Sequence, residues 1–361
     1  MTVRVGVVGG GLIAQAMHLH HLAAKPNRFE IVALAEPSRT VREALGARYG
    51  IPDLHPDYRG LLGGGVDALV VCSPAGTHAE IVLAGLEAGA HVFVEKPMCI
   101  TMRDANAIVA ARDRTGLVVQ VGTMKRFDPA YERMLAELPE SAAALRYVSV
   151  VVNDPEFEPY FAEGEVVRGR DISPELIDAT RRSEAEQVEE AVGAGDPDTV
   201  RAFSESYLGS MIHDLNVVHG LLEGMGEPLP AEVVDGAWWN EGRAVTGAMR
   251  LRNGSRADLA WIQLLDTHEY RESVTLFFDE SVRSLQFPSP WLKQYPTVYR
   301  RAERREGADA VRETMSYEEA FSRELDHFHT CVTVGEPCRT PPEQARLDIE
   351  VLTAMFRASR A

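Results

Sequence analysis

The stretch Val3-Arg-Val-Gly-Val-Val-Gly-Gly-Gly-Leu-Ile-Ala14 decides the fold. Its apolar run from Val3 to Val8 predicts a strand buried on both faces, and the apolar periodicity of residues 12–24 predicts a helix. Between them lies the spacing Gly9-x-Gly11-x-x-Ala14. A strand, a tight glycine turn and a helix start in this order are typical of a dinucleotide-binding crossover, although a plain glycine turn is the alternative.

The small residues of this turn have separate physical tasks. Gly9 permits a backbone turn that a side chain would block, and Gly11 lets the backbone approach a pyrophosphate. Ala14 is small enough for the helix to pack against the strand. The helix start, with Leu12 and Ile13, offers unpaired N–H groups and a positive dipole end. We therefore expect Gly9, Gly11, Leu12 and Ile13 to contact the phosphates of a cofactor.

Composition and charge argue against several other classes of protein. With 361 residues, of which 45% are hydrophobic, the chain is long enough for two domains with ample cores. A net charge of −17 argues against nucleic-acid binding, and no apolar run is long enough to span a membrane. The N-terminus lacks the basic and apolar regions of a signal peptide. We therefore expect a cytoplasmic protein with no nucleic-acid or membrane partner.

The cysteines predict no metal site. Cys331 and Cys338 could meet in a loop, but two reduced thiols are the simpler interpretation. Neither they nor the two other cysteines have the spacing of metal ligands. Reduced cysteines also fit the cytoplasm.

Strand and helix patterns alternate through the first third of the chain. This alternation predicts a parallel sheet with helices on both faces, a Rossmann dinucleotide-binding domain over residues 1–123. Ligands of such sheets bind at the carboxyl ends of the strands. We therefore expect Glu36, Ser73-Pro74 and Glu95-Lys96-Pro97, which follow three of these strands, to line the site. The predicted strands are 3–8, 30–35, 66–71, 91–94 and 117–121, with helices at 79–88 and 102–115.

Glu36 bears on the choice of cofactor. A carboxylate at the end of the second strand can accept hydrogen bonds from the adenosine ribose and would repel a 2′-phosphate. This favours NAD over NADP. Arg39 and Arg42 lie close enough in sequence to keep NADP open.

The periodicity changes after residue 123. Consecutive strand patterns linked by turns such as Asn253-Gly254 and Asp279-Glu280 predict a large, mostly antiparallel sheet in a C-terminal α+β domain, residues 124–361. We expect an acidic helical insertion at about 154–206, or alternatively a flap over the substrate, and a C-terminal helix at about 341–360. Both alternations of strand 256–264 contain apolar residues, so both sheet faces should be covered and a dimer is plausible. The predicted strands are 145–152, 233–239, 244–251, 256–264, 272–278 and 281–287.

Two side chains suit hydride-transfer chemistry. Lys96 could hydrogen-bond a substrate oxygen and stabilise charge on it, or it could be an exposed strand-end lysine. His213 lies in a helical pattern, on a small polar face with Gly209, Asn216 and Gly220. A histidine there suits proton exchange near neutral pH, although a structural histidine explains this stretch equally well.

Along nearly its whole length the chain resembles the glucose–fructose oxidoreductase/inositol dehydrogenase (Gfo/Idh/MocA) family. The Glu95-Lys96-Pro97 motif after the fourth strand is the most telling feature. The stretches that carry the resemblance are Gly6-Val-Val-Gly-Gly-Gly-Leu-Ile-Ala14, Val71-Cys-Ser-Pro-Ala-Gly-Thr-His78, Leu86-Glu-Ala-Gly-Ala-His-Val-Phe-Val-Glu-Lys-Pro97, Val121-Gly-Thr-Met-Lys-Arg-Phe-Asp-Pro-Ala-Tyr131 and Phe328-His-Thr-Cys-Val-Thr-Val-Gly-Glu-Pro337.

The resemblance implies an NAD(P)-dependent oxidoreductase of a sugar, cyclitol or related polyol, acting as a homodimer or homotetramer. By similarity, Lys96 orients the reacting oxygen and His213 exchanges its proton. Ser73, Pro74 and His78 should line the nicotinamide side of the cleft together with the Glu95-Lys96-Pro97 motif. Arg126 is expected to contact substrate or brace Lys96, and a buried structural arginine is the alternative.

Gly209 departs from the family pattern. Many dehydrogenases of this family carry an aspartate four residues before the histidine, where it shares a helix face with the imidazole. With Gly209 at that position, either another carboxylate substitutes or proton transfer differs. Two further functions therefore stay open, namely a sugar enzyme that uses NAD transiently without net redox and a non-catalytic dinucleotide-binding regulator.

Overall fold

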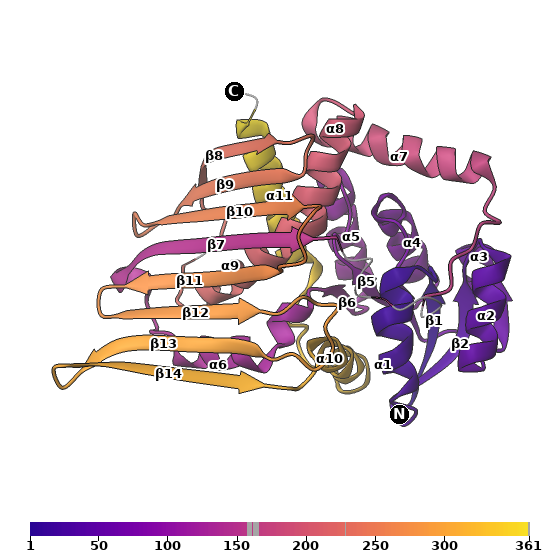
Figure 1. Ribbon diagram of the computed structural model, residues 1–361. Coiled ribbons are helices and arrows are strands. Elements are labelled where there is room, and N and C mark those ends of the chain that lie inside the picture. The colour runs from indigo at the N-terminus through magenta and orange to yellow at the C-terminus, as the bar shows by residue number, and fades with distance from the viewer. Residues whose placement is uncertain (157–160, 162–165, 228, 360–361) are drawn as a thin grey trace. The chain divides into compact units, whose positions relative to one another are not determined.

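The computed structural model describes residues 1–156, 161, 166–227 and 229–359. The chain folds into two compact units (Figure 1). The first unit comprises residues 1–123, 161–187 and 321–346, and the second comprises 124–160, 188–320 and 347–361. The domain boundary drawn from the sequence at residue 123 assigned 161–187 and 321–346 to the second domain, whereas both segments pack with the first unit.

A six-stranded parallel sheet forms the centre of the first unit, in the order β3-β2-β1-β4-β5-β6. The strand order reverses between β1 and β4, which is where Rossmann-type sheets bind their ligands. The five predicted strands are confirmed, and the short strand β3 was not predicted. The bounds are β1 Val3–Val8, β2 Phe29–Ala35, β3 Asp53–His55, β4 Ala68–Val71, β5 His91–Glu95 and β6 Val119–Gly122.

Helices pack on this sheet through small and apolar side chains. Ala14 is fully buried in the same apolar cluster as Val5 and Val7, as its predicted role requires. Leu325 and Phe328 of helix α10 join that cluster although they lie some 300 residues later in the chain. The helices of the first unit are η1 Ala14–His18, α1 Leu19–Ala23, α2 Arg39–Tyr49, α3 Tyr58–Leu62, α4 Ala75–Glu87, α5 Met102–Thr115 and α10 Ala320–Val334.

The second unit is built on an eight-stranded sheet in the order β14-β13-β12-β11-β7-β10-β9-β8. All neighbours are antiparallel except β7 and β10, which run parallel. The predicted antiparallel sheet is thus confirmed, and its two strands β13 and β14 were not predicted. The bounds are β7 Leu145–Pro155, β8 Glu232–Trp239, β9 Ala244–Arg250, β10 Arg256–Leu264, β11 Arg271–Phe278, β12 Ser281–Phe287, β13 Thr297–Arg305 and β14 Ala308–Ser316.

The described helices of this unit cover one face of the sheet, with α9 and α11 behind it in Figure 1. Val148, Val150 and Val152 point to that face and are buried, whereas Val151 between them is 42% exposed. In the single chain the second face is left exposed, so the expectation that both faces are covered depends on a partner copy and stays a prediction. The helices of the second unit are η2 Met124–Phe127, α6 Pro129–Glu137, η3 Ala142–Ala144, α8 Pro197–Val200, η5 Arg201–Met211, α9 Ile212–Glu223 and most of α11 Pro342–Ala358.

The acidic insertion contains helix α7, Pro174–Val192, which runs from the first unit into the second. Its early residues Leu176 and Ile177 are exposed, as a solvated helix would be. Part of the predicted insertion, 157–160 and 162–165, and residue 360 of the predicted C-terminal helix lie outside the described residues. Across the part of the chain that the structure describes, no helix is both long and apolar enough to cross a membrane.

Candidate active site

The glycine turn after β1 has the form of a phosphate cradle. Gly9 has φ +93°, and a Cβ there would lie 2.7 Å from the carbonyl oxygen of Cys72 and 2.8 Å from the nitrogen of Ser73. Only glycine fits this close approach of the β1 and β4 ends. At Gly11, by contrast, a Cβ would meet nothing within 4 Å. The backbone at Gly11 is thus open to a ligand, with Leu12 and Ile13 half-buried beside it.

Glu36 fastens this turn to the end of β2. Its two carboxylate oxygens accept hydrogen bonds from the N–H groups of Gly10 and Ser38, each at 2.8 Å. The side chain is only 8% exposed. Glu36 lies directly after β2, as its place in the sequence predicts. Its carboxylate also has a structural role, because it holds the glycine turn and the start of α2 in place through these two hydrogen bonds.

Residues 167–171 of the insertion lie against the same turn. Gln15 donates to the carbonyl oxygens of Gly10 and Val167, and the N–H of Val167 donates back to the Gln15 amide oxygen. Asp171 accepts from the Ser38 hydroxyl at 2.5 Å and from the N–H of Thr40 at 3.0 Å. Sequence reasoning missed Gln15 and Asp171, because nothing in the insertion's local pattern shows that it returns to the start of α2.

His78 joins the loops that follow β4 and β5. One ring nitrogen faces the Ser73 carbonyl oxygen at 2.7 Å and the other faces the Pro97 carbonyl oxygen at 2.8 Å. Burial lowers the pKa of His78, so the neutral ring donates to one carbonyl at a time. The Lys96–Pro97 peptide bond is cis. Ser73, His78, Lys96 and Pro97 thus lie together at one sheet edge, but the side chain of His78, which was expected to line the cleft, is buried behind the loops.

Glu95 points into the protein beneath Lys96. One of its oxygens pairs with Nε2 of His18 at 2.6 Å, and the other accepts from the N–H of Lys96 at 3.1 Å. Burial alone would raise the pKa of Glu95, but His18 and then Lys96 outweigh it and lower that pKa. Glu95 therefore orients the Lys96 backbone from below. It was predicted as a cofactor contact, and His18 was not predicted as its partner.

A second carboxyl group, Glu324 of α10, lies beside this pair. One polar atom each of His18, Glu95 and Glu324 lies within 4.8 Å of the others. Glu324 is fully buried, and neither of its carboxyl oxygens has a hydrogen-bond partner among the described residues. Burial, and then the nearby charge of Glu95, raise the pKa of Glu324 well above its usual range. Glu324 is consequently a neutral acid in the folded chain near pH 7.

His213 is the second residue of α9 in the second unit and is half-buried. It follows the π-helical segment η5, in which Gly209 lies. A Cβ at Gly209 would stand 3.0 Å from the carbonyl oxygen of Ser204, so the backbone is tight there. The neighbouring Asp214 lies 3.5 Å from Nζ of Lys125, which also pairs with Glu272. Asp214 is therefore committed to a buried ion cluster.

Two residues of the polar helix face predicted around His213, Asn216 and Gly220, pack within the second unit. Asn216 donates to Asp348 of α11 at 2.7 Å, and Nδ1 of His219 lies 2.8 Å from the other oxygen of that carboxylate. A Cβ at Gly220 would meet the guanidinium of Arg126 at 2.2 Å. That guanidinium donates to the carbonyl oxygen of Asn216 at 3.3 Å and is only 5% exposed. Arg126 is therefore packed against α9, which favours the structural alternative for it.

The family that matches the first unit has the NAD-binding Rossmann fold that its parallel sheet and glycine turn show. Residues 3–123 match the model of the family GFO_IDH_MocA, described as an oxidoreductase family with an NAD-binding Rossmann fold. Inositol 2-dehydrogenase 3 of Saccharopolyspora erythraea is 41% identical over 140 residues, 37% of this chain and 40% of that protein. The NAD(+)-dependent scyllo-inositol 2-dehydrogenase of Bacillus subtilis is 32% identical over 130 residues, 36% of this chain and 38% of that protein. The matched stretch thus spans about two fifths of these curated relatives.

Solved structures resemble both units of the chain. A 3-ketoreductase from Actinomadura kijaniata, described in complex with NADP, superposes with TM-score 0.74 at 20% identity, covering 99% of this chain and 98% of that one. The scyllo-inositol dehydrogenase of Lactobacillus casei, described with bound NAD(H) and scyllo-inositol, gives TM-score 0.71 at 17% identity, covering 100% and 97%. At these identities the likeness establishes the fold.

Proposed function

We propose that the chain is an NAD(P)-dependent oxidoreductase of a polyol, cyclitol or sugar, because residues 3–123 match the model of the GFO_IDH_MocA oxidoreductase family and resemble inositol 2-dehydrogenases. The observation that carries the proposal is the pairing, on one sheet edge, of an open glycine turn with Lys96. A dinucleotide fits the turn because Gly11 leaves room for the pyrophosphate and Gly9 allows the backbone conformation. Bound nicotinamide would supply or accept the hydride.

We assign Lys96 the role of holding the reacting oxygen. The backbone N–H of Lys96 donates to the Glu95 carboxylate, and the carbonyl oxygen of Pro97 lies within hydrogen-bonding distance of His78. The side chain of Lys96 therefore extends from a fixed backbone. A fixed cation aimed at a hydroxyl or carbonyl oxygen stabilises the charge that develops there during hydride transfer. By similarity we propose His213 as the proton-exchanging residue, since an imidazole side chain suits general acid–base catalysis near neutral pH.

A substrate screen tests this function. Purified chain with NAD+ or NADH and a panel of inositols, sugars and nucleotide-sugars should change the absorbance of the reduced nicotinamide with at least one member. Lys96→Ala should lower kcat by about 100-fold or more while leaving cofactor affinity nearly unchanged. Lys293→Ala removes an exposed lysine of the second unit and is the matched control. Equal rates in Lys96→Ala and the parent would remove Lys96 from the mechanism.

The same screen separates the other two functions. Product formation without net NADH would indicate a transient-redox enzyme. Nucleotide binding with no turnover on the whole panel would instead favour a regulatory protein, for which Gly209 gives some support because it leaves His213 without the family's i−4 carboxylate.

We propose NAD rather than NADP as the preferred cofactor. The proposal is supported by two carboxylates, Glu36 and Asp171, which accept backbone hydrogen bonds at the start of α2, because the acidic residue after the second strand of such folds usually faces the ribose 2′ position. Hydrogen bonds from Ser38, then from Thr40, lower the pKa of Asp171 to about 2, so it is charged at neutral pH.

Fluorescence titration of NADH and NADPH checks this preference without any substrate. Asp171→Asn should improve the affinity for NADPH relative to NADH by roughly tenfold, because one negative charge is removed from the 2′ position. Asp178→Asn changes an exposed carboxylate on α7 and is the control. An unchanged ratio in Asp171→Asn would contradict the assignment.

We also propose that the chain is a cytoplasmic homodimer or homotetramer. The sheet face of the second unit that bears no helices carries Val151, 42% exposed, and Phe277, 36% exposed. A partner copy would cover this apolar surface. Sedimentation velocity should show an oligomer that Phe277→Asp disrupts, whereas Leu176→Asp on α7 should not; a monomeric parent would rule the proposal out.

A further inference from the structure

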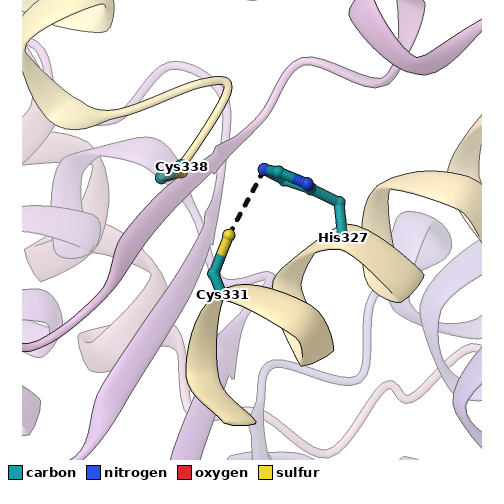
Figure 2. A group of neighbouring side chains, drawn as sticks. All are labelled: His327, Cys331 and Cys338. Carbon is teal, nitrogen blue, oxygen red and sulfur yellow. Dashed lines mark hydrogen bonds between the residues drawn. The ribbon is translucent and has the colours of Figure 1, made fainter. Parts of the chain in front are cut away.

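We propose that the C-terminal part of the first unit holds a zinc-type metal site built from His327, Cys331 and Cys338. This site is independent of the proposed oxidoreductase function. Figure 2 shows His327 and Cys331 on successive turns of α10 and Cys338 on the loop that follows. One ligand atom of each residue lies within 4.8 Å of the others.

The separations suit a tetrahedral ion. Sγ of Cys331 lies 3.3 Å from Nε2 of His327. Zinc bonds of about 2.3 Å to sulfur and 2.0 Å to nitrogen place ligand atoms roughly 3.5–3.8 Å apart in a tetrahedron. The three side chains therefore need only small movements to enclose an ion. Two sulfurs and one imidazole favour Zn²⁺ over oxygen-seeking Mg²⁺ or Ca²⁺.

The imidazole is in the tautomer that a metal ligand needs. Nε2 of His327 accepts a hydrogen bond from the N–H of Arg339 at 2.9 Å, so its lone pair faces the cluster. The other nitrogen, Nδ1, stands 3.8 Å from the carboxylate of Glu336. A carboxylate behind a histidine is a common second partner in zinc sites. A bound ion would take the place of the Arg339 N–H group at Nε2.

The loop that carries Cys338 is held in place from its other side. Thr340 accepts from the N–H of Val121 at 2.9 Å through its carbonyl and donates from its hydroxyl to the Val121 carbonyl at 2.8 Å. These bonds fix the loop to the end of β6, and α10 fixes the other two ligands. Cys331 is buried and Cys338 is half-buried, and a water molecule would complete a tetrahedral site. The ion would clip α10 to the end of the parallel sheet.

Metal titration of the full chain tests the site. Protein stripped with a chelator and kept under a non-thiol reductant should bind one Co²⁺ per chain, with a thiolate-to-cobalt charge-transfer band that Zn²⁺ abolishes. Zn²⁺ should also protect Cys331 and Cys338 from alkylation, which mass spectrometry reads in the unmutated protein. The absence of the cobalt band while both thiols remain free would overturn the proposal.

Variants identify the ligands. Cys338→Ser and His327→Ala should each weaken Zn²⁺ binding by roughly tenfold or more. His329→Ala, on the same helix but outside the cluster, should bind as the parent does. Unchanged affinity in both ligand variants would contradict the assignment, and so would a Cys331–Cys338 disulfide that forms in air despite saturating Zn²⁺.

Discussion

Replacing Glu324 with glutamine should stabilise the first unit, by an amount that grows with pH. The parent carboxyl group is fully buried without a hydrogen-bond partner among the described residues, and burial raises its pKa. The folded chain therefore keeps a proton that the unfolded chain releases above about pH 4.3. In that window the unfolded state binds fewer protons, so the parent loses stability as the pH rises. Glutamine has the same shape and no proton to lose.

The size of the effect follows from proton linkage. Each pH unit between the unfolded and folded pKa of Glu324 costs the parent about 1.4 kcal/mol relative to Glu324→Gln. From pH 5 upward the stability gain of the variant should therefore grow by about 1.4 kcal/mol per pH unit for as long as the folded parent keeps this proton. Below pH 4 both states of the parent hold the proton, and the two proteins should differ little.

The assay must report on the first unit. All four tryptophans, Trp238, Trp239, Trp261 and Trp291, lie in the second unit, so tryptophan fluorescence would follow the wrong one. Amide hydrogen exchange of β5 and β6, compared between variant and parent at each pH, measures the local opening free energy. Glu280→Gln, in the exposed turn between β11 and β12, is the control. A variant-minus-parent difference that stays flat from pH 5 to pH 7 would refute the reasoning.

Four further substitutions test individual contacts. Gly9→Ala should destabilise the first unit by about 3 kcal/mol, because its Cβ meets backbone atoms at a positive φ, whereas Gly11→Ala should leave hydrogen exchange unchanged and weaken only cofactor binding. Asp348→Ala should cost about 2–4 kcal/mol in urea unfolding of the second unit, since it leaves two buried polar partners unsatisfied, and a loss below 1 kcal/mol would contradict this. Gly209→Asp should raise the pKa seen in the kcat/KM profile by supplying a carboxylate at i−4 from His213, with about 1 kcal/mol of lost stability from its 3.0 Å contact; an unshifted profile would argue against His213 as the base.

The parallel sheet could be predicted from sequence because its strands are buried on both faces. Such strands are continuous apolar runs, and their ends, from Gly9 to Lys96, project to one edge by topology alone. Strands β13 and β14 escaped prediction for the opposite reason. They lie at one edge of the second sheet and contain runs of charged residues such as Arg300-Arg301 and Arg312-Glu313, so they look like solvated chain.

The partners of the predicted site residues could not be found in the same way. Lys96 and Glu36 belong to local motifs, but His18 reaches Glu95 across 77 residues and Asp171 reaches Ser38 across 133. Such pairs depend on how the chain returns in space, which periodicity does not encode. The same holds for His327, Cys331 and Cys338, whose spacing resembles no common ligand pattern until a helix and the loop after it fold together.

The first unit is assembled from three separate segments of the chain, and this has a consequence for its folding during synthesis on the ribosome. The hydrogen bond between Val121, at the end of β6, and Thr340 can form only after the 219 residues up to Thr340 have been synthesised. At elongation rates of about 5–20 residues per second, the synthesis of this stretch takes roughly 10–45 s. The nascent Rossmann half must therefore persist with an unfinished edge while the second unit emerges, which makes it a natural client for chaperones.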